Sequence, residues 1–304
     1  MIRTLKDYSI ILLKGVAMGA ADVVPGVSGG TIAFISGIYE ELLESISSIS
    51  FKTIEVLKTQ GINAAWKQIN GNFLISLLIG IGISVVSLAK IISWLLENEP
   101  VLLWAFFFGL VVASIFFIGK QITKWNVVTF IVLAGGTILA YWVTTLQPLV
   151  TENSSSVFFF ISGAFAICAM ILPGISGAFI LVLLGAYKPV LEAVHNRDFK
   201  IIIIGAGAIM GLLTFSRLLK WLFHHHKNLT LAILTGFVLG SLNKIWPWKM
   251  IIESKVIEEK EVVLMEQSIS PFAYGEDNQL LLAVLVATIG FITIILLEKL
   301  AVKK

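Results

Sequence analysis

The stretch DVVPGVSGGTI, residues 22–32, lies between two apolar segments and decides how this part of the chain can fold. It contains Pro25, Gly26, Gly29 and Gly30. Because proline removes a backbone donor and glycine destabilises helix interiors, the stretch is expected to end any helix that reaches it. Inside a bilayer, the backbone groups that such a break frees must line protein or a protein-walled cavity. The sequence therefore predicts either a solvent-facing turn or a functional site.

The composition predicts an all-α integral membrane protein. Of the 304 residues, 57% are hydrophobic and only 13% are charged, and the mean hydropathy is +0.94. A soluble domain carries roughly 25% charged residues, so this chain has too few to cover a surface in water. Most of its apolar runs reach the roughly 17–25 residues that a spanning helix needs. These runs are 73–96, 101–118, 127–145, 201–223, 229–245 and 280–297.

A second copy of the opening stretch follows later in the chain. PGVSGGTIAFISGIYEELLESI, which starts at Pro25, aligns without gaps with PGISGAFILVLLGAYKPVLEAV, which starts at Pro173. A further ungapped match, with a smaller offset, includes Gly80 and Gly207. The order of these matches indicates that the chain repeats itself, with an extra loop in the first copy.

The matches divide one membrane domain into two repeats, residues 1–150 and 151–304. Each repeat is predicted to contain a Pro-Gly-interrupted re-entrant helical hairpin followed by three transmembrane helices. Three crossings are an odd number, so the second repeat is expected to be inverted relative to the first. The distribution of lysine and arginine agrees with this and places both termini in the cytoplasm. An amphipathic cytoplasmic insertion is expected at about 45–71, and an extracytoplasmic loop at about 247–278.

A helix that begins just after each break would suit an anion, in particular a phosphate. Its first turn offers unpaired N–H groups and the positive end of the helix dipole. Lys90 and its equivalent Arg217 add one cation to each repeat. In the alternative interpretation the Pro-Gly pairs only turn a hairpin, and the two cations reach toward the membrane surface. The predicted phosphate-binding residues are Ser28, Gly29, Gly30, Thr31, Ser176, Gly177, Lys90 and Arg217, and the predicted break residues are Pro25, Gly26, Pro173 and Gly174.

Three carboxylates are candidates for proton coupling. Asp22 directly precedes the first break, and an ionisable residue inside a membrane is a functional hypothesis by default. Its equivalent in the second repeat is Met170, so only one repeat would carry protons at this position. The alternative role of Asp22 is to cap the break. Glu44 and Glu192 lie at equivalent positions in the second arms and are either proton carriers or interfacial anchors.

Neither a metal, a cofactor nor an enzymatic activity is expected. Cys168 is the single cysteine. The histidine run at 224–226 has no carboxylate or cysteine clustered with it in sequence, so it is interpreted as a cytoplasmic turn. The chain contains no Walker loop and no H-E-x-x-H or G-x-S-x-G motif, which leaves an ion gradient or passive exchange as the energy source for transport.

GAADVVPGVSGGTIAFISGIYEELLESI and ILPGISGAFILVLLGAYKPVLEAV resemble the bacterial polyprenyl-phosphate translocases of the PopT type, and the resemblance covers essentially the whole chain. It implies transport of undecaprenyl phosphate, the lipid carrier of cell-wall precursors. The spent carrier would return from the outer to the inner leaflet of the plasma membrane, driven by a proton or ion gradient. The expected partners are this lipid and the bilayer, with a second copy of the chain as a further candidate and no nucleic acid.

Two other functions remain as alternatives to carrier-lipid transport. A secondary transporter of a small soluble anion, such as phosphate, would use the same helix starts but would need no opening toward the lipid. A membrane enzyme acting on lipid phosphates would need a nucleophile or a metal inside the membrane, which His195 alone does not provide.

Overall fold

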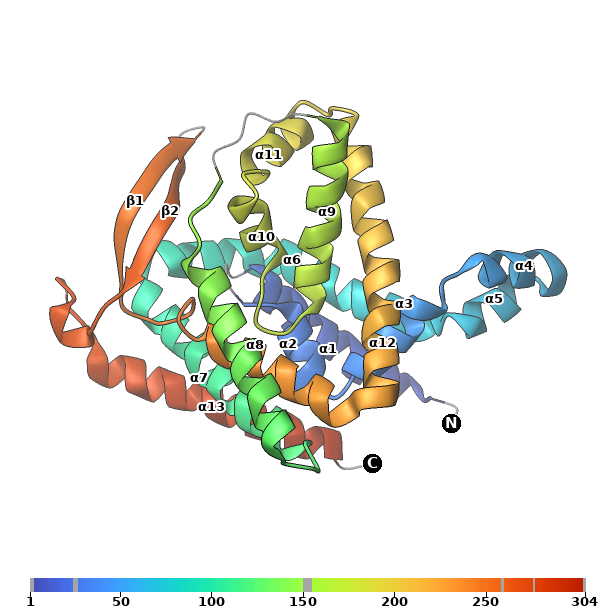
Figure 1. Ribbon diagram of the computed structural model, residues 1–304, viewed down its shortest axis with the longest axis horizontal. Coiled ribbons are helices and arrows are strands. Elements are labelled where there is room, and N and C mark those ends of the chain that lie inside the picture. The colour runs from blue at the N-terminus through green and yellow to red at the C-terminus, as the bar shows by residue number, and fades with distance from the viewer. Residues whose placement is uncertain (1–2, 24–26, 150–154, 258–259, 276, 303–304) are drawn as a thin grey trace.

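Helices form most of the structure. The computed structural model describes residues 3–23, 27–149, 155–257, 260–275 and 277–302 (Figure 1). The helices of the first half are α1 (Leu5–Val23), α2 (Gly29–Ile35), α3 (Tyr39–Ser48), α4 (Phe51–Gln60), α5 (Ile62–Gln68), α6 (Gly71–Asn98), α7 (Pro100–Lys120) and α8 (Val127–Thr145). Those of the second half are α9 (Ser156–Ile171), α10 (Gly177–Leu183), α11 (Tyr187–His195), α12 (Lys200–Ser241), the 3-10 turn η1 (Pro271–Ala273) and α13 (Leu280–Val302). To the expected all-α class the structure adds one antiparallel hairpin, β1 (Lys249–Ile257) and β2 (Lys260–Ser268).

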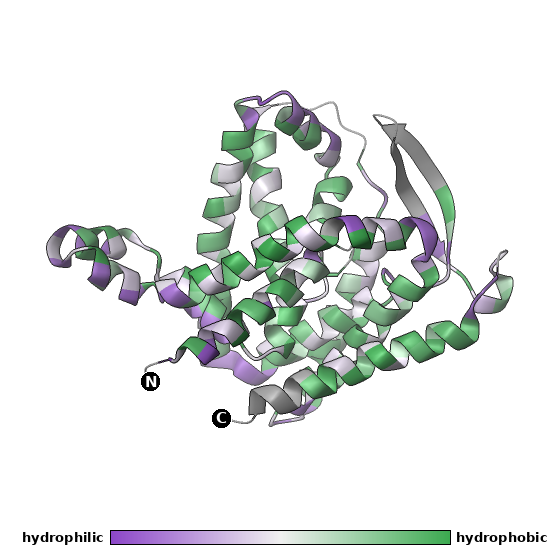
Figure 2. Ribbon diagram, turned by 180° about the vertical axis from the view of Figure 1, so that it is seen from behind, coloured by the Kyte–Doolittle hydropathy of each residue, from purple (hydrophilic) through white to green (hydrophobic). Residues whose placement is uncertain are grey.

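Four of the described helices, α6, α7, α8 and α12, are long and apolar enough to cross a membrane. A fifth span results if α10 and α11, which meet at a bend of 108°, are counted as one broken segment. Ser156–Ile171 and Leu280–Leu296 are apolar but shorter helical stretches. Figure 2 shows hydrophobic residues along the long helices and hydrophilic residues gathered toward their ends. The expectation of a helical membrane protein is confirmed at this level.

Helix α12 joins two segments that the sequence analysis expects as separate spans, 201–223 and 229–245. The backbone leaves helical geometry at His226, where φ is −136° and ψ is 45°. The linking sequence HHHKN contains neither proline nor glycine, so nothing in it forces a loop. The two halves of α12 therefore meet at a sharp bend, which Figure 1 shows below the upright part of the helix.

The long helices pack in pairs through small residues. Helix α1 lies against α6 and α9 against the first half of α12, while α7 pairs with α13 and α8 with the second half of α12. A methyl group added at Gly80 would overlap the Leu12 carbonyl of α1, and one added at Gly207 would overlap the Phe160 carbonyl of α9. Small residues let helix backbones approach closely where no hydrophobic effect drives them together. The glycines that match in sequence thus make matching contacts.

The arms that follow the two breaks are packed differently. All seven residues of α2 are buried, whereas Leu183 is the buried residue of α10. Helix α2 lies within the body of the protein, while α10 and α11 stand beside α9 at its edge (Figure 1). The insertion forms the helix pair α4–α5, which projects from the body and carries the exposed apolar side chains Phe51, Ile62 and Trp66. Its position on the inner membrane surface stays a prediction.

Candidate functional site

The two breaks contact each other in the interior of the protein. The Ser28 hydroxyl donates to the Met170 carbonyl across 2.8 Å, and the Gly174 N–H donates to the Thr31 hydroxyl across 3.0 Å. Ser28 and Thr31 are each 1% exposed. Residues that lie about 140 positions apart in the chain are therefore joined by hydrogen bonds from one break to the other. Pro25 and Gly26 lie outside the described residues.

The end of α9 fits tightly against the first arm. A methyl group added at Gly30 would overlap the Ile171 carbonyl, so the close approach depends on glycine at this position. The same carbonyl accepts a hydrogen bond from the Tyr39 hydroxyl across 3.1 Å. In the second break Pro173 is buried, and Gly174 has a φ of +87°, which glycine adopts without strain.

The start of α2 is closed by groups of the protein itself. Asp22 Oδ1 accepts from the Gly29 N–H across 2.7 Å, and the Ser28 hydroxyl accepts from the Gly30 N–H across 3.1 Å as the helix N-cap. A carboxylate at a helix N-terminus is favoured by the helix dipole. The donors expected to hold a phosphate are therefore occupied in this conformation, and Asp22 stands where the anion was expected.

The start of α10 is more open than that of α2. Ser176 is its N-cap residue, but its side chain makes no capping hydrogen bond. Gly177 rests against the Ala166 carbonyl of α9, and the next residue, Ala178, is exposed. Ser176 itself is 7% exposed, so the second helix start differs from the first in lacking side-chain caps and in being exposed from Ala178 onward.

The predicted cations lie on exposed helix surfaces. Lys90 is exposed on α6, and Arg217 is exposed on α12. The Arg217 guanidinium donates to the carbonyl of Ile49, at the end of α3, across 2.6 Å. The helix neighbours Trp94 and Trp221 are 57% and 50% exposed. The structure does not bring this lysine–arginine pair to the breaks.

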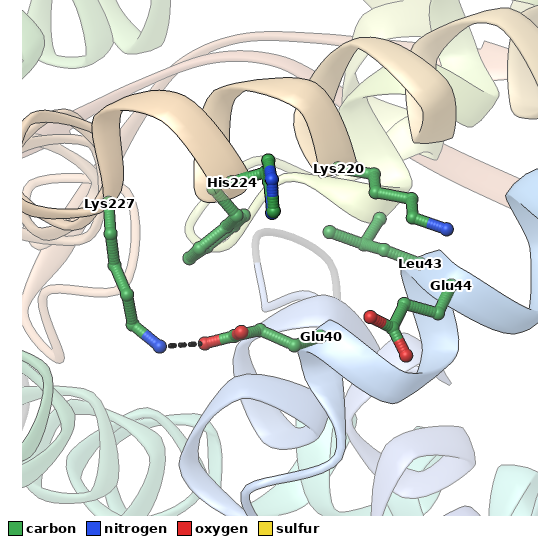
Figure 3. Close-up of a pocket in the computed structure, with 7 residues that line it drawn as sticks. Glu40, Leu43, Glu44, Lys220, His224 and Lys227 are labelled. Carbon is green, nitrogen blue, oxygen red and sulfur yellow. Dashed lines mark hydrogen bonds and ion pairs between the residues drawn. The ribbon is translucent and has the colours of Figure 1, made fainter.

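A cavity of about 310 Å³ lies between α3 and α12 (Figure 3). Lys227 and Glu40 close one side of it with an ion pair of 2.7 Å. Glu44 and Lys220 face the cavity from opposite helices (Figure 3). The lining consists of Glu40, Leu43, Glu44, Lys220, Phe223, His224 and Lys227. Of the predicted proton-coupling carboxylates, Glu44 lies here, whereas Glu192 lies on α11.

Sequence reasoning missed this cavity as a cluster. Lys227 follows the bend at His226, but Glu40 and Glu44 lie four residues apart on α3, as do Lys220 and His224 on α12, so each pair shares one helix face. That periodicity was available in the sequence. The pairing of α3 with α12 was not, because it joins segments some 180 residues apart.

Aromatic rings link the cavity to the breaks. Phe223, which lines the cavity, lies 5.9 Å from the Tyr39 ring and 6.2 Å from the Phe34 ring, measured between centroids. Tyr39 is 2% exposed and holds the Ile171 carbonyl. Phe223, Tyr39 and the Ile171 carbonyl thus form a continuous line of contacts from the cavity to the end of α9.

Two broken arms that meet inside a helical membrane protein are typical of transporters with interrupted helices. The chain belongs to the undecaprenyl phosphate translocase-like family, whose model matches residues 18–263. It is 47% identical over 303 residues to a polyprenyl-phosphate transporter of Vibrio cholerae, covering 98% of each chain. It is 31% identical over 256 residues to a polyprenyl-phosphate transporter of Staphylococcus aureus, covering 78% of this chain and 86% of the relative. No solved structure matches the chain.

Proposed function

We propose that this protein transports undecaprenyl phosphate across the plasma membrane, from the outer to the inner leaflet, so that the carrier lipid can be used again. The family and the relatives named polyprenyl-phosphate transporters support the substrate class. The observation in the structure that carries the proposal is the contact between two breaks inside an apolar helical body. A phosphate on a long apolar tail needs such a polar interior for its headgroup, because an unpaired charge is costly in hydrocarbon.

The two halves are inverted repeats in this proposal, with both termini in the cytoplasm. The matched helix contacts of Gly80 and Gly207 support a shared architecture. So do Gly109, which packs against α13, and its equivalent Gly236, which packs against α8. Each repeat thereby exchanges one helix contact with the other half, as expected for two halves related by a pseudo-two-fold axis.

Exchange between the two arms would move the headgroup. In the conformation described here, α2 is buried and its start is closed by Asp22, while α10 is partly exposed. In the opposite conformation α10 would close and α2 would open. The phosphate would then pass from Ser176 and Gly177 to Ser28, Gly29, Gly30 and Thr31, and its tail would stay in the lipid.

A proton gradient would supply the driving force through Asp22. Protonation removes the negative charge that closes the start of α2 and weakens the hydrogen bond of Asp22 to the Gly29 N–H, so that the incoming phosphate would displace the neutral carboxyl group. Glu44 is a second candidate, because it lies in a cavity with Lys220 and His224. Glu192 is a weaker one, since it lies 3.5 Å from Lys188 one turn away on an exposed helix face.

Reconstitution into liposomes tests the function. Labelled undecaprenyl phosphate is placed in one leaflet, and its movement is followed with and without a proton gradient, beside protein-free liposomes. We expect movement that depends on the protein and is faster with the gradient. Ser28→Ala removes the hydrogen bond from the first break to the Met170 carbonyl and is expected to slow movement at least tenfold, whereas Ser87→Ala, at an exposed position of α6, serves as the matched control. Folded protein that moves inorganic phosphate but no lipid would replace the proposal with a soluble-anion transporter.

A further inference from the structure

Two lysines and a glutamate form a cluster at the base of the β-hairpin. Lys244 and Lys249 each lie 2.9 Å from the same carboxylate oxygen, Oε1 of Glu266. The Lys249 ammonium also donates to the Lys244 carbonyl across 2.6 Å. The side chains of Lys249, Lys244 and Glu266 are 9%, 22% and 22% exposed. The cluster is therefore held inside the protein and is still reachable at its Lys244 side.

Aromatic rings from two other elements form walls of the cluster. The Lys249 ammonium lies 3.9 Å from the centre of the Trp104 ring on α7. The Lys244 ammonium lies 4.9 Å from the centre of the Phe179 ring on α10. Aromatic faces stabilise a cation that has lost part of its hydration. The hairpin base, α7, the turn that follows α12 and the arm α10 thus converge on two ammonium groups.

The charges of the cluster do not cancel. Two ammonium groups share one carboxylate, and no second carboxylate among the described residues forms an ion pair with either lysine. Burial lowers the pKa of Lys249 to about 8, although Glu266 acts in the opposite direction. Burial would raise the pKa of Glu266, but the two lysines outweigh it and hold that pKa below its ordinary value. An excess positive charge that is partly removed from water favours a further anion.

The second break lies close to this cluster. Gly174 packs against Val238 and Ser241, near the end of α12 and about one turn before Lys244. Phe179, which covers the Lys244 ammonium, lies in the first turn of α10. An anion that engages Lys244 would therefore act at the base of the arm whose start is open.

We propose that Lys244 and Lys249 bind a phosphate monoester, with the Glu266 carboxylate as the internal group that the phosphate displaces. The proposal rests on the transport function above and adds the place where the headgroup is first captured. Lysine ammonium groups bind phosphate as point charges. Both ammonium groups here contact a single carboxylate oxygen, so a phosphate can replace the Glu266 carboxylate as their shared anion. The same chemistry would also accept free inorganic phosphate.

Binding to the purified full-length protein tests the proposal. The probes are farnesyl phosphate, a short prenyl phosphate, inorganic phosphate, and farnesol, which lacks the phosphate. We expect Lys244→Gln and Lys249→Gln to weaken binding of farnesyl phosphate at least tenfold. Glu266→Gln is expected to tighten it several-fold, because the internal competitor is lost. Lys120→Gln, at an exposed helix end elsewhere, is the control and should change nothing.

Glu266→Gln separates an anion site from an ion pair that only supports the fold. A purely structural role predicts a lower thermal midpoint and no gain in affinity, and this outcome would overturn the proposal. If Lys249→Gln does not fold, Lys249→Arg keeps the charge, and affinity that no longer falls between pH 7 and pH 9 would support the site, whereas an unchanged fall would count against it. If the variants rank in the same order in their affinity for inorganic phosphate, the site stands, and free phosphate is also a ligand of it.

Failure of the capture site is distinguishable from failure of the transport function. If the wild type moves labelled undecaprenyl phosphate but the three cluster variants bind farnesyl phosphate as the wild type does, the capture site is wrong and transport stands. If the two lysine variants lose binding of farnesyl phosphate and Glu266→Gln gains it, but the wild type moves no lipid, the site stands and carrier-lipid transport falls.

Discussion

At Asp22 a carboxylate occupies the helix start at which the sequence predicted a phosphate. The prediction of a buried helix start was sound, because Ser28, Gly29 and Gly30 do form one. The sequence could not tell whether a ligand or a side chain would satisfy it. Asp22 was near enough in the chain to do so, and the structure has it accept from the Gly29 N–H. The capping role is therefore present, and a proton-coupling role stays a prediction.

Two substitutions at Asp22 separate capping from proton coupling. Asp22→Asn keeps an oxygen that can accept from the Gly29 N–H but cannot carry a proton at ordinary pH. Asp22→Ala removes the cap, at a cost of about 0.5–2 kcal/mol. If Asp22 couples transport to protons, both variants lose gradient-driven lipid movement, while only Asp22→Ala lowers the thermal midpoint. Gradient-driven movement by Asp22→Asn at the wild-type rate would leave Asp22 with capping alone.

At Lys249 the phosphate-capture proposal predicts a dependence on pH. The groups that face this ammonium are Glu266 from β2, Lys244 from the turn that follows α12 and the Trp104 ring from α7. With its pKa lowered to about 8, Lys249 loses its charge as the pH rises from 7 to 9. A phosphate monoester has its second pKa near 6, so its own charge is constant over this range.

The expected result is a several-fold loss of affinity for farnesyl phosphate between pH 7 and pH 9, measured by titration calorimetry. Lys249→Arg should flatten the profile, because a guanidinium stays charged throughout. An equally steep fall in the arginine variant would show that another group titrates.

At the scale of the elements, the sequence repeat matched two positions that have the same packing role in the structure. Gly80 and Gly207 were matched by offset alone, and both prove to lie against the backbone of a neighbouring helix. Contacts between elements far apart in the chain could not be predicted from the sequence. A single sequence carries no signal that α3 packs beside α12, or that Trp248, just before β1, donates to the Asn278 carbonyl just before α13. Hydrophobic periodicity identifies which face of a helix is buried, but it does not identify the element that packs against that face.

A matched pair of glycines on α6 tests the helix pairing. Gly80→Ala places a methyl group against the Leu12 carbonyl, whereas Gly82→Ala meets no other described group within 4 Å. We expect the first to destabilise the protein by roughly 1–3 kcal/mol, as overpacking does. The second should be neutral or stabilise it by about 0.5–1 kcal/mol, because alanine favours the helix. Thermal unfolding in detergent measures both, and equal midpoints would argue against the close contact of α1 and α6.

At the scale of the whole molecule, the two halves have similar sequences at the breaks but different packing. The sequence predicted two equivalent helix starts, and the structure brings the two breaks into contact. It also buries α2 and leaves α10 partly exposed. A repeat in the sequence defines what the halves share. Whether α2 or α10 is packed against the body of the protein depends on the conformation, and the sequence repeat does not determine it.

Gly30 and its equivalent Ala178 give a test of whether contact between the breaks is needed for transport. A methyl group at Gly30 would overlap the Ile171 carbonyl, so Gly30→Ala has to push the two breaks apart. Ala178 already carries a methyl group on the exposed arm, and Ala178→Gly removes it from an open site. We therefore expect Gly30→Ala to slow lipid movement in liposomes at least tenfold and Ala178→Gly to leave it within about twofold of the wild type.

Size-exclusion profiles and thermal midpoints establish that both variants are folded before their rates are compared. The contrast depends on the asymmetry of the two arms, because a pair of equally packed breaks would respond equally to a methyl group. Wild-type transport by folded Gly30→Ala would mean that the headgroup passes without the breaks touching. Equal loss in both variants would place α10, like α2, against the body during the transport cycle, and the exposed arm would then be one stage of that cycle.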